Sequence, residues 1–89
     1  MAARFLEGKG WTVLERNLRR GRGEIDLVIL RGSVVAFVEV KCRSGTEFGY
    51  PLEAISPAKR DEMARVARAW LEDVKLPRGC ILRYDAVSV

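Results

Sequence analysis

The sequence predicts a small mixed α/β domain in which a helix, three strands, a second helix and a last strand follow one another. Three observations carry this prediction. Residues 25–30 and 34–40 are two apolar runs, and the short connection between them contains a glycine, which is the pattern of a β-hairpin. Ser56-Pro57 is a typical helix start, with a serine N-cap before a proline at the first helical position. Alternation over 80–89 predicts the final strand.

The residues before the hairpin predict one helix and one strand. Residues 2–9 form the expected helix, with Phe5 and Leu6 as apolar anchors and glycines bracketing its end. Residues 11–18 alternate well enough for a strand, which turns at residues 21–23 into the hairpin. A short helix and a strand therefore precede the hairpin.

The second half of the chain is expected to contain a long loop and the amphipathic helix. Residues 42–55 contain two glycines and a proline and show little periodicity, so we expect a loop there. After Ser56, apolar residues recur at helical spacing, so that one face of the helix packs on the sheet. Trp70 belongs to that apolar stripe and is therefore expected to be a core anchor rather than a platform for base stacking.

Composition places the chain among small globular domains. Its 89 residues are 48% hydrophobic, so we expect one folded domain over residues 1–89. No apolar run approaches the roughly 20 residues that cross a bilayer, and the N-terminus lacks a signal-peptide hydrophobic region, so we expect a cytoplasmic protein without a membrane partner. Cys42 and Cys80 stand far apart and histidine is absent, which argues against a zinc site or a disulfide framework.

Four charged residues inside the hairpin are the first candidates for a functional site. Because side chains alternate along a strand, Glu24 and Asp26 are expected on one face of the first strand, and Glu39 and Lys41 on one face of the second. Burying ionised carboxylates is costly unless they are paired or bind a metal. Hard cations such as Mg²⁺ take oxygen ligands, which makes Asp26 and Glu39 candidate metal ligands. Lys41 can then orient or help to deprotonate an attacking water. The constellation indicates metal-assisted hydrolysis of a phosphodiester.

The alternative is an ordinary solvated sheet face, on which the glutamates pair with Lys41 across the hairpin. The neighbours on the same faces favour a site over this alternative. Val28 and Leu30 are expected to continue the face of Asp26, and the residues that lead into Glu39 are apolar as well. Charges at the end of an apolar face lie at its rim, where functional sites are often built.

A second group of charges precedes the hairpin. The chain carries a net charge of +4, with twelve arginines against four lysines, which points toward an anionic partner. Residues 16–22 read RNLRRGR and come directly before the strand of Asp26. The planar guanidinium binds phosphate through two hydrogen bonds, so this segment can hold a nucleic-acid backbone. The alternative is a solvated turn whose basic residues protect an edge strand.

Asp26 followed by Glu39-Val40-Lys41 on the adjacent strand resembles the PD-(D/E)xK nuclease superfamily. More closely, the chain resembles the YraN family of small bacterial proteins, which is similar to archaeal Holliday junction resolvases. This resemblance implies a restriction-endonuclease-like core in minimal form, Asp26 and Glu39 as metal ligands, the Val40 carbonyl as a backbone ligand and Lys41 as the catalytic lysine. The matching residues, spread over nearly the whole chain, are Asn17, Arg19, residues 23–28, residues 37–43 and Lys59.

The chain departs from that family at one position. Many members of the superfamily carry a further glutamate on the helix before the first strand, and YraN-like chains show it a few residues before the segment that begins here with Ala2. This sequence begins with Met1 just after that point. Either the first helical turns have been lost or the true start lies upstream, and we expect the missing acid to affect catalysis but not the fold.

These observations together predict a metal-dependent endonuclease-like domain that hydrolyses phosphodiester bonds in DNA, including branched or structured DNA, with Mg²⁺ or Mn²⁺ as cofactor. Glu24 is expected to be an auxiliary ligand, and a homodimer that presents two sites to two strands is a reasonable hypothesis. One alternative is an inactive nucleic-acid-binding or adaptor module that retains the nuclease fold. Another is an interaction protein whose carboxylates pair with its arginines. The residues predicted to contact the nucleic-acid backbone are Arg16, Arg19, Arg20, Arg22, Arg43 and Lys59.

Overall fold

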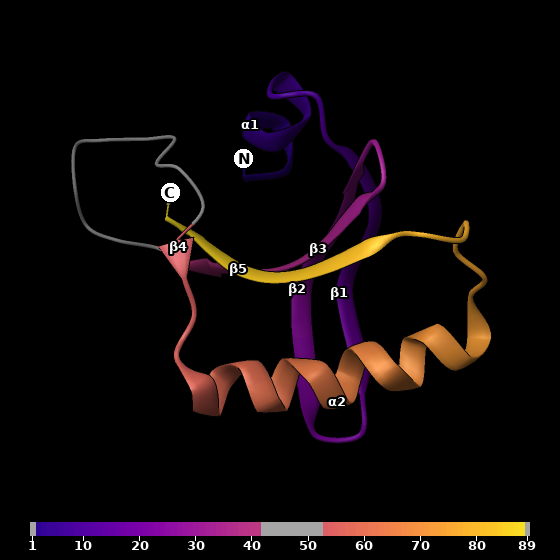
Figure 1. Ribbon diagram of the computed structural model, residues 1–89. Coiled ribbons are helices and arrows are strands. Elements are labelled where there is room, and N and C mark those ends of the chain that lie inside the picture. The colour runs from indigo at the N-terminus through magenta and orange to yellow at the C-terminus, as the bar shows by residue number, and fades with distance from the viewer. Residues whose placement is uncertain (1, 42–52, 89) are drawn as a thin grey trace.

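The computed structural model describes residues 2–41 and 53–88 as one mixed sheet with a helix on each face (Figure 1). The predicted order of elements is confirmed, with one addition: Glu53–Ala54, expected to belong to a loop, pairs with the last strand as a short strand. The rest of the predicted loop, residues 42–52, lies outside the described residues. The elements are α1 (Ala2–Gly8), β1 (Thr12–Arg20), β2 (Gly23–Arg31), β3 (Val34–Lys41), β4 (Glu53–Ala54), α2 (Pro57–Asp73) and β5 (Ile81–Ser88).

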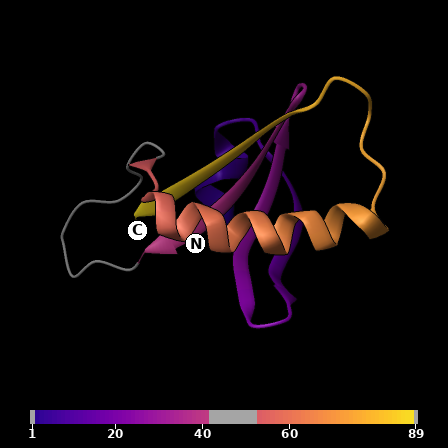
Figure 2. The same cartoon turned by 60° about the horizontal axis from the view of Figure 1, so that its bottom comes forward.

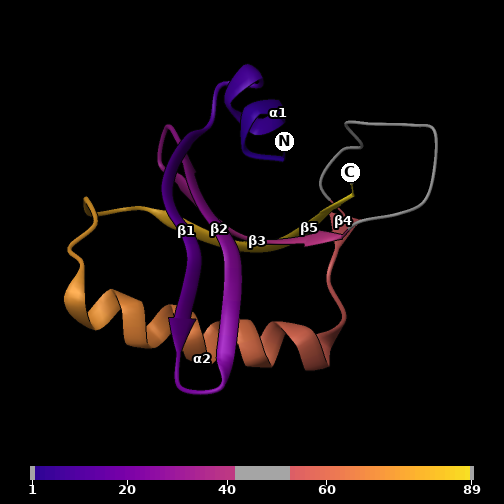
Figure 3. The same ribbon diagram turned by 180° about the vertical axis from the view of Figure 1, so that it is seen from behind.

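The sheet has the strand order β1-β2-β3-β5-β4, and its long strands pair antiparallel except for β3 and β5, which are parallel. A parallel pair needs a crossover connection, and α2 supplies it between β3 and β5. Figure 3, from behind, shows α1 and α2 on opposite sides of the strands. Neither described helix is long and apolar enough to cross a membrane.

Two apolar cores result from the alternation of side chains along the central strands. On the α2 side, Phe37 lies edge-on to Trp70, with ring centroids 5.8 Å apart, and stacks on Tyr84 at 5.4 Å. Trp70 is 2% exposed, which confirms it as a core anchor. On the α1 side, Leu6 and Trp11 pack with residues of β2 and β3. The sheet is thus covered on both faces, as a strand rich in valine and isoleucine requires.

The start of α2 follows its predicted capping signal. The Ser56 hydroxyl accepts a hydrogen bond from the Lys59 main-chain N–H at 3.3 Å, and Pro57 is the first helical residue. This cap satisfies one of the four main-chain N–H groups that a helix leaves without an internal partner. It also places the Lys59 side chain in the first turn of α2, beside the end of β3.

The sheet divides into two arms at Asp26 and Glu39. The pairing of β2 with β3 begins at Arg31 opposite Val34 and ends at Leu27 opposite Val38. Beyond that pair, β2 continues along β1, whereas β3 continues along β5 to the pair of Lys41 and Ser88. Figure 1 shows the β1–β2 hairpin and the β3–β5 pair running in different directions from this point, and Figure 2 shows the hairpin tip protruding beyond α2. The two predicted metal ligands therefore stand at the fork, one on each arm.

Candidate active site

The carboxylate of Asp26 connects the two arms at the fork. Its Oδ2 accepts a hydrogen bond from the main-chain N–H of Val40 at 2.7 Å, the short length expected when the acceptor is charged. A side-chain oxygen thus takes a place that a main-chain carbonyl holds elsewhere in the ladder. In an extended strand the N–H and C=O of one residue point to the same side, so the Val40 carbonyl also points toward β2.

Asp26 lies on the opposite side of the sheet from the one expected. It lines a surface hollow together with Ala2 and Ala3 of α1, whereas Val28 packs in the core on the α2 side. The expectation that Asp26 and Val28 share a face is therefore wrong. The alternation of β2 is broken at Asp26, since Ile25 packs on the α2 side and Leu27, two residues on, packs on the α1 side. Between the paired residues of β1 at the same level, Asn17 has a left-handed backbone with φ 51°. Asparagine adopts this conformation more readily than most residues.

Glu39 is held by α2 and not by its own strand neighbours. Its Oε1 lies 3.2 Å from Nζ of Lys59, and the same ammonium lies 2.9 Å from Oε2 of Glu62. Hydrogen bonding to Glu62, with a smaller contribution from Glu39, raises the pKa of Lys59, although partial burial opposes the shift. The hydrogen bond from Lys59 lowers the pKa of Glu62. One ammonium is therefore shared by two carboxylates at the fork.

From the sequence we expected Lys59 to contact a DNA phosphate, and we did not expect its ion pair with Glu62. The sequence does contain a signal for this pair, because oppositely charged residues three positions apart on a helix are neighbours.

Lys41 is exposed at the end of β3. Because Val40 packs on the α1 side, alternation places Lys41 on the same side as Glu39.

Glu24 is separate from the other two carboxylates. Its Oε2 pairs with Nε of Arg19 at 2.9 Å, and both side chains are well exposed. Over residues 2–41 and 53–88, the structure contains no cluster of three or more acidic or cysteine side chains that could hold a metal. The oxygens at the fork are the carboxylate of Asp26 on the α1 side, the carboxylate of Glu39, which Lys59 holds on the α2 side, and the main-chain carbonyl of Val40. The structure thus places the two predicted ligands on different sides of β3. The ion-pair partners of Glu24 and Glu39 in the structure are Arg19 and Lys59. The alternative of a solvated sheet face named Lys41 as their partner instead.

The predicted phosphate-contacting arginines divide between the two sides of the hairpin. Arg16 lines the hollow beside Asp26 on the α1 side. Arg20 and Arg22 instead line a hollow against α2, and Arg20 also approaches Asp73 at 3.4 Å. Arg43 lies outside the described residues. Because β1 is an edge strand, protection of that edge by basic side chains is also consistent with this arrangement.

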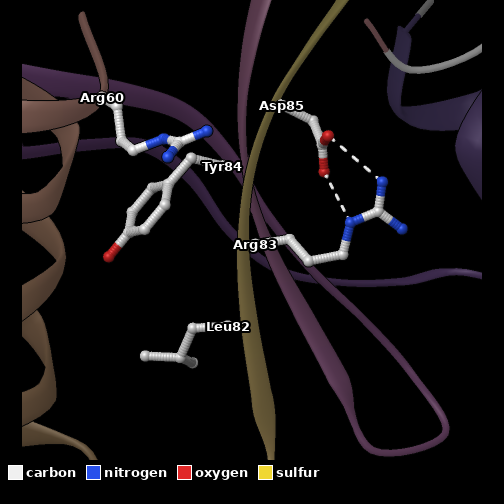
Figure 4. A pocket seen from close by; sticks show the side chains of 5 residues that line it. All are labelled: Arg60, Leu82, Arg83, Tyr84 and Asp85. Carbon is white, nitrogen blue, oxygen red and sulfur yellow. Dashed lines mark hydrogen bonds and ion pairs between the residues drawn. The ribbon is translucent and has the colours of Figure 1, made fainter. Parts of the chain in front are cut away.

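A further acidic residue, Asp85, is neutralised within its own strand. Its carboxylate is 7% exposed and meets the guanidinium of Arg83 through two contacts, 3.1 Å to Nε and 3.2 Å to Nη2 (Figure 4). Figure 4 shows this pair on one side of β5 and Arg60 and Tyr84 on the other. A buried charge needs such a partner, and Asp85 lies within the sheet, where it pairs with Val38 of β3 and Ala54 of β4.

Comparison with known proteins identifies the family. The model of the Uncharacterised protein family UPF0102 matches residues 1–89. The chain belongs to this family. A UPF0102 protein of Caldicellulosiruptor saccharolyticus is 40% identical over 88 residues, which cover 99% of this chain and 74% of that protein. A UPF0102 protein of Chlorobium chlorochromatii is 42% identical over 89 residues, covering 100% and 67%, and UPF0102 protein BL0935 of Bifidobacterium longum is 43% identical over 91 residues, covering 99% and 73%.

The family match confirms the predicted resemblance to YraN proteins. The names of these UPF0102 relatives state no activity. A function for this UPF0102 chain must therefore be argued from the chemistry of the fork.

Proposed function

We propose that this UPF0102 domain is a metal-dependent nuclease-like domain that hydrolyses phosphodiester bonds in DNA, including branched or structured DNA. The observation that supports it most is the fork, where the sheet divides between Asp26 and Glu39 and the Asp26 carboxylate is held by the Val40 main chain. A divided sheet with acidic groups at the division gives a cation access to main-chain and side-chain oxygens that continuous pairing would cover.

The donor set suits a hard divalent cation. Two carboxylates and one main-chain carbonyl are oxygen ligands, and Mg²⁺ typically takes one or two protein carboxylates while keeping waters and substrate phosphate oxygens. Bound there, Mg²⁺ or Mn²⁺ would supply positive charge to the phosphoryl oxygens and lower the pKa of a coordinated water. Glu39 would have to leave Lys59, whose ammonium lies 3.2 Å from its Oε1, and turn from the α2 side toward Asp26 to share an ion with it.

The chain's own groups have distinct roles in this proposal. Asp26 is oriented by the N–H of Val40 and would present its carboxylate to the ion. Lys41, exposed next to the fork, would orient the attacking water and stabilise the negative charge that develops on it and on the phosphoryl oxygens. Lys59 stays beside Glu62 once Glu39 leaves it, and its charge is then available to a phosphate oxygen. Arg16, in the hollow with Asp26, contacts the backbone on the α1 side.

The experiment is a calorimetric titration of Mn²⁺ into the wild-type protein and the Asp26→Asn and Glu39→Gln variants, with and without a short four-way DNA junction. We expect both substitutions to abolish Mn²⁺ binding. Glu24→Gln is the matched control, since it removes a hairpin carboxylate that pairs with Arg19 instead, and it should leave Mn²⁺ binding unchanged. A wild-type protein that is folded and binds no Mn²⁺, even with the junction present, would contradict the proposal.

The second candidate function is a nucleic-acid-binding or adaptor module that keeps the fold without catalysis. The ion pair of Glu39 with Lys59 favours it, because that ammonium already neutralises one of the proposed ligands. In this case the junction binds with strong salt dependence, and no Mn²⁺ binds.

A homodimer that presents two forks to two strands belongs to the nuclease proposal, and a sedimentation mass of one chain on the bound junction would contradict it.

A further inference from the structure

We infer that a second phosphate-binding site lies between the β1–β2 turn and α2, away from the fork. Three arginines from two elements line one hollow there: Arg20 and Arg22 from the turn, and Arg65 from α2. This hollow, called the arginine hollow below, takes a phosphodiester group of the nucleic-acid backbone. The identity of the ligand as nucleic acid rests on the proposed function, whereas the affinity for phosphate rests on the arginines alone.

The arginine hollow is held in shape by an unusually close approach of the hairpin to the helix. A Cβ atom added at Gly23 would lie 2.4 Å from Cγ2 of Val66, a distance that real Cβ atoms do not reach. Gly23 pairs with Arg20 in the ladder of β1 and β2, and Val66 follows Arg65 on the helix. The glycine therefore brings the turn arginines and the helix arginine onto opposite walls of one hollow, where a phosphate can meet both.

The charge balance of the arginine hollow is positive. Three arginines line it, whereas Glu62 is the one acidic side chain on its wall within the part of the chain that the structure describes, and the Lys59 ammonium that Glu62 shares with Glu39 lies 2.9 Å away and reduces its charge. The hydrogen bond from Lys59 lowers the pKa of Glu62, and the charge of Arg65 adds to the shift. Arg20 approaches Asp73 at only 3.4 Å, and both side chains are substantially exposed. An exposed pair of this kind contributes little, so a phosphate can replace Asp73 as the partner of Arg20.

The arginine hollow and the fork lie at different places on the hairpin. Gly23 precedes Asp26 by three residues, which is about 10 Å along a strand. Arg16 faces the α1 side beside Asp26, whereas the arginine hollow faces α2. A nucleic acid that binds both the fork and the arginine hollow therefore contacts two sides of the β1–β2 hairpin. Phosphates outside the fork then contribute to its affinity.

The test is the affinity for a fluorescent four-way DNA junction in EDTA, measured by anisotropy over a range of KCl concentrations. We expect Arg65→Gln and Arg22→Gln to reduce the slope of log affinity against log salt by about 0.9 each, which corresponds to an affinity loss of about eightfold at 0.1 M salt. Arg68→Gln is the control, because it removes the same charge from an exposed position of the same helix. Arg68 does not line the arginine hollow. Equal losses for Arg65→Gln and Arg68→Gln would overturn the inference.

Inorganic phosphate gives a second readout without nucleic acid. Titrated into ¹⁵N-labelled wild-type protein, it should shift the Nε–Hε resonances of Arg22 and Arg65 and leave that of Arg68 in place. The Gly23→Ala variant keeps every charge but pushes the turn away from Val66, so it should weaken these shifts while circular dichroism confirms that the protein is folded. Shifts of the same size at Arg68 as at Arg65 would count against the site.

Mn²⁺ titration of the same variants separates this inference from the proposed function. Arg65→Gln should bind Mn²⁺ as the wild-type protein does, since Asp26 and Glu39, the proposed ligands, are unchanged and neither lines the arginine hollow. If the wild type binds phosphate in the arginine hollow but binds no Mn²⁺, the nuclease function is wrong and the phosphate site stands. If Mn²⁺ binds at the fork and Arg65→Gln behaves like Arg68→Gln, the phosphate site is wrong and the nuclease function stands.

Discussion

The two carboxylates at the fork are held in contrasting ways. Asp26 is held by the main chain, through the N–H of Val40 at 2.7 Å, whereas Glu39 is held by a side chain, the ammonium of Lys59 at 3.2 Å. A main-chain donor within a sheet has little freedom to move away. A lysine has four rotatable bonds and a second carboxylate, Glu62, to stay with. The comparison indicates that Asp26 is an integral part of the fold, while Glu39 can exchange its partner when a cation or phosphate arrives.

The largest expected effect comes from removing the main-chain contact. Asp26→Ala leaves the Val40 N–H without its acceptor in a partly buried position, which costs about 1–3 kcal/mol. Asp26→Asn retains an oxygen that can accept this hydrogen bond and should lose less. Urea denaturation measures both free energies of unfolding. Equal stability of the alanine variant and the wild type would show that the hydrogen bond does not hold the arms together.

Removing the exchangeable partner should change metal affinity more than stability. Lys59→Met frees Glu39 and Glu62 and removes a positive charge from the fork, so Mn²⁺ should bind more tightly than to the wild type. The stability loss should stay below about 1 kcal/mol, because the ion pairs are partly exposed. Lys75→Met is the control, since Lys75 is exposed and follows the end of α2. Calorimetry that finds weaker Mn²⁺ binding in Lys59→Met would mean that Lys59 does not compete for Glu39.

The ammonium of Lys59, shared by Glu39 and Glu62, predicts that the free energy of unfolding depends on pH. The hydrogen bond to Lys59 holds the pKa of Glu62 below its ordinary value of 4.5, so its stabilising contribution is present above pH 4.5 and is lost as the pH falls through the lowered pKa. The pKa of Lys59 is raised above 10.5, so its contribution is present below that pH and is lost on further rise. In ¹³C NMR titrations, Lys59→Met should return the pKa of Glu62 toward 4.5. An unchanged titration would contradict the pair.

The smallest effect is expected at Glu24. Its pair with Arg19 is exposed, and such pairs contribute about 0–1 kcal/mol. Glu24→Gln should therefore change the free energy of unfolding by less than about 1 kcal/mol in urea denaturation. The difference should shrink further in high salt, where exposed charges are screened. A loss as large as that of Asp26→Ala would mean that Glu24 belongs to the fork after all.

Local signals in the sequence were enough to predict the elements. The serine cap and proline mark the start of α2, and the apolar stripe contains Trp70. Apolar runs around a glycine turn mark the hairpin, and alternation marks the first and last strands. Each signal depends on residues close in the sequence. The two-residue strand β4 could not be predicted, because it has no such local signal. Its pairing with Ala86 and Asp85 depends on a partner more than thirty residues away, and a run of two residues has no period to detect.

The side of the sheet on which Asp26 lies could not be predicted by counting residues. Strict alternation places it with Val28, but β2 breaks the alternation here, with Ile25 on the α2 side and Leu27 on the α1 side. The break lies at the level where Asn17 of β1 has a left-handed backbone. Asparagine tolerates that conformation without requiring it. The sequence identified the residues of the fork, and the interrupted ladder decided where they point.

What the sequence by itself determined is the order of the elements, the family and the presence of acidic and basic groups in and around the hairpin. Only the tertiary structure decided their partners: Val40 for Asp26, Lys59 for Glu39, and Arg65 beside the turn arginines. The physical reason is that composition and periodicity are local, whereas hydrogen bonds and ion pairs form between groups that packing brings together. The division of the sheet and the contact of Gly23 with Val66 are such packing events, and they place the charges on which both proposals depend.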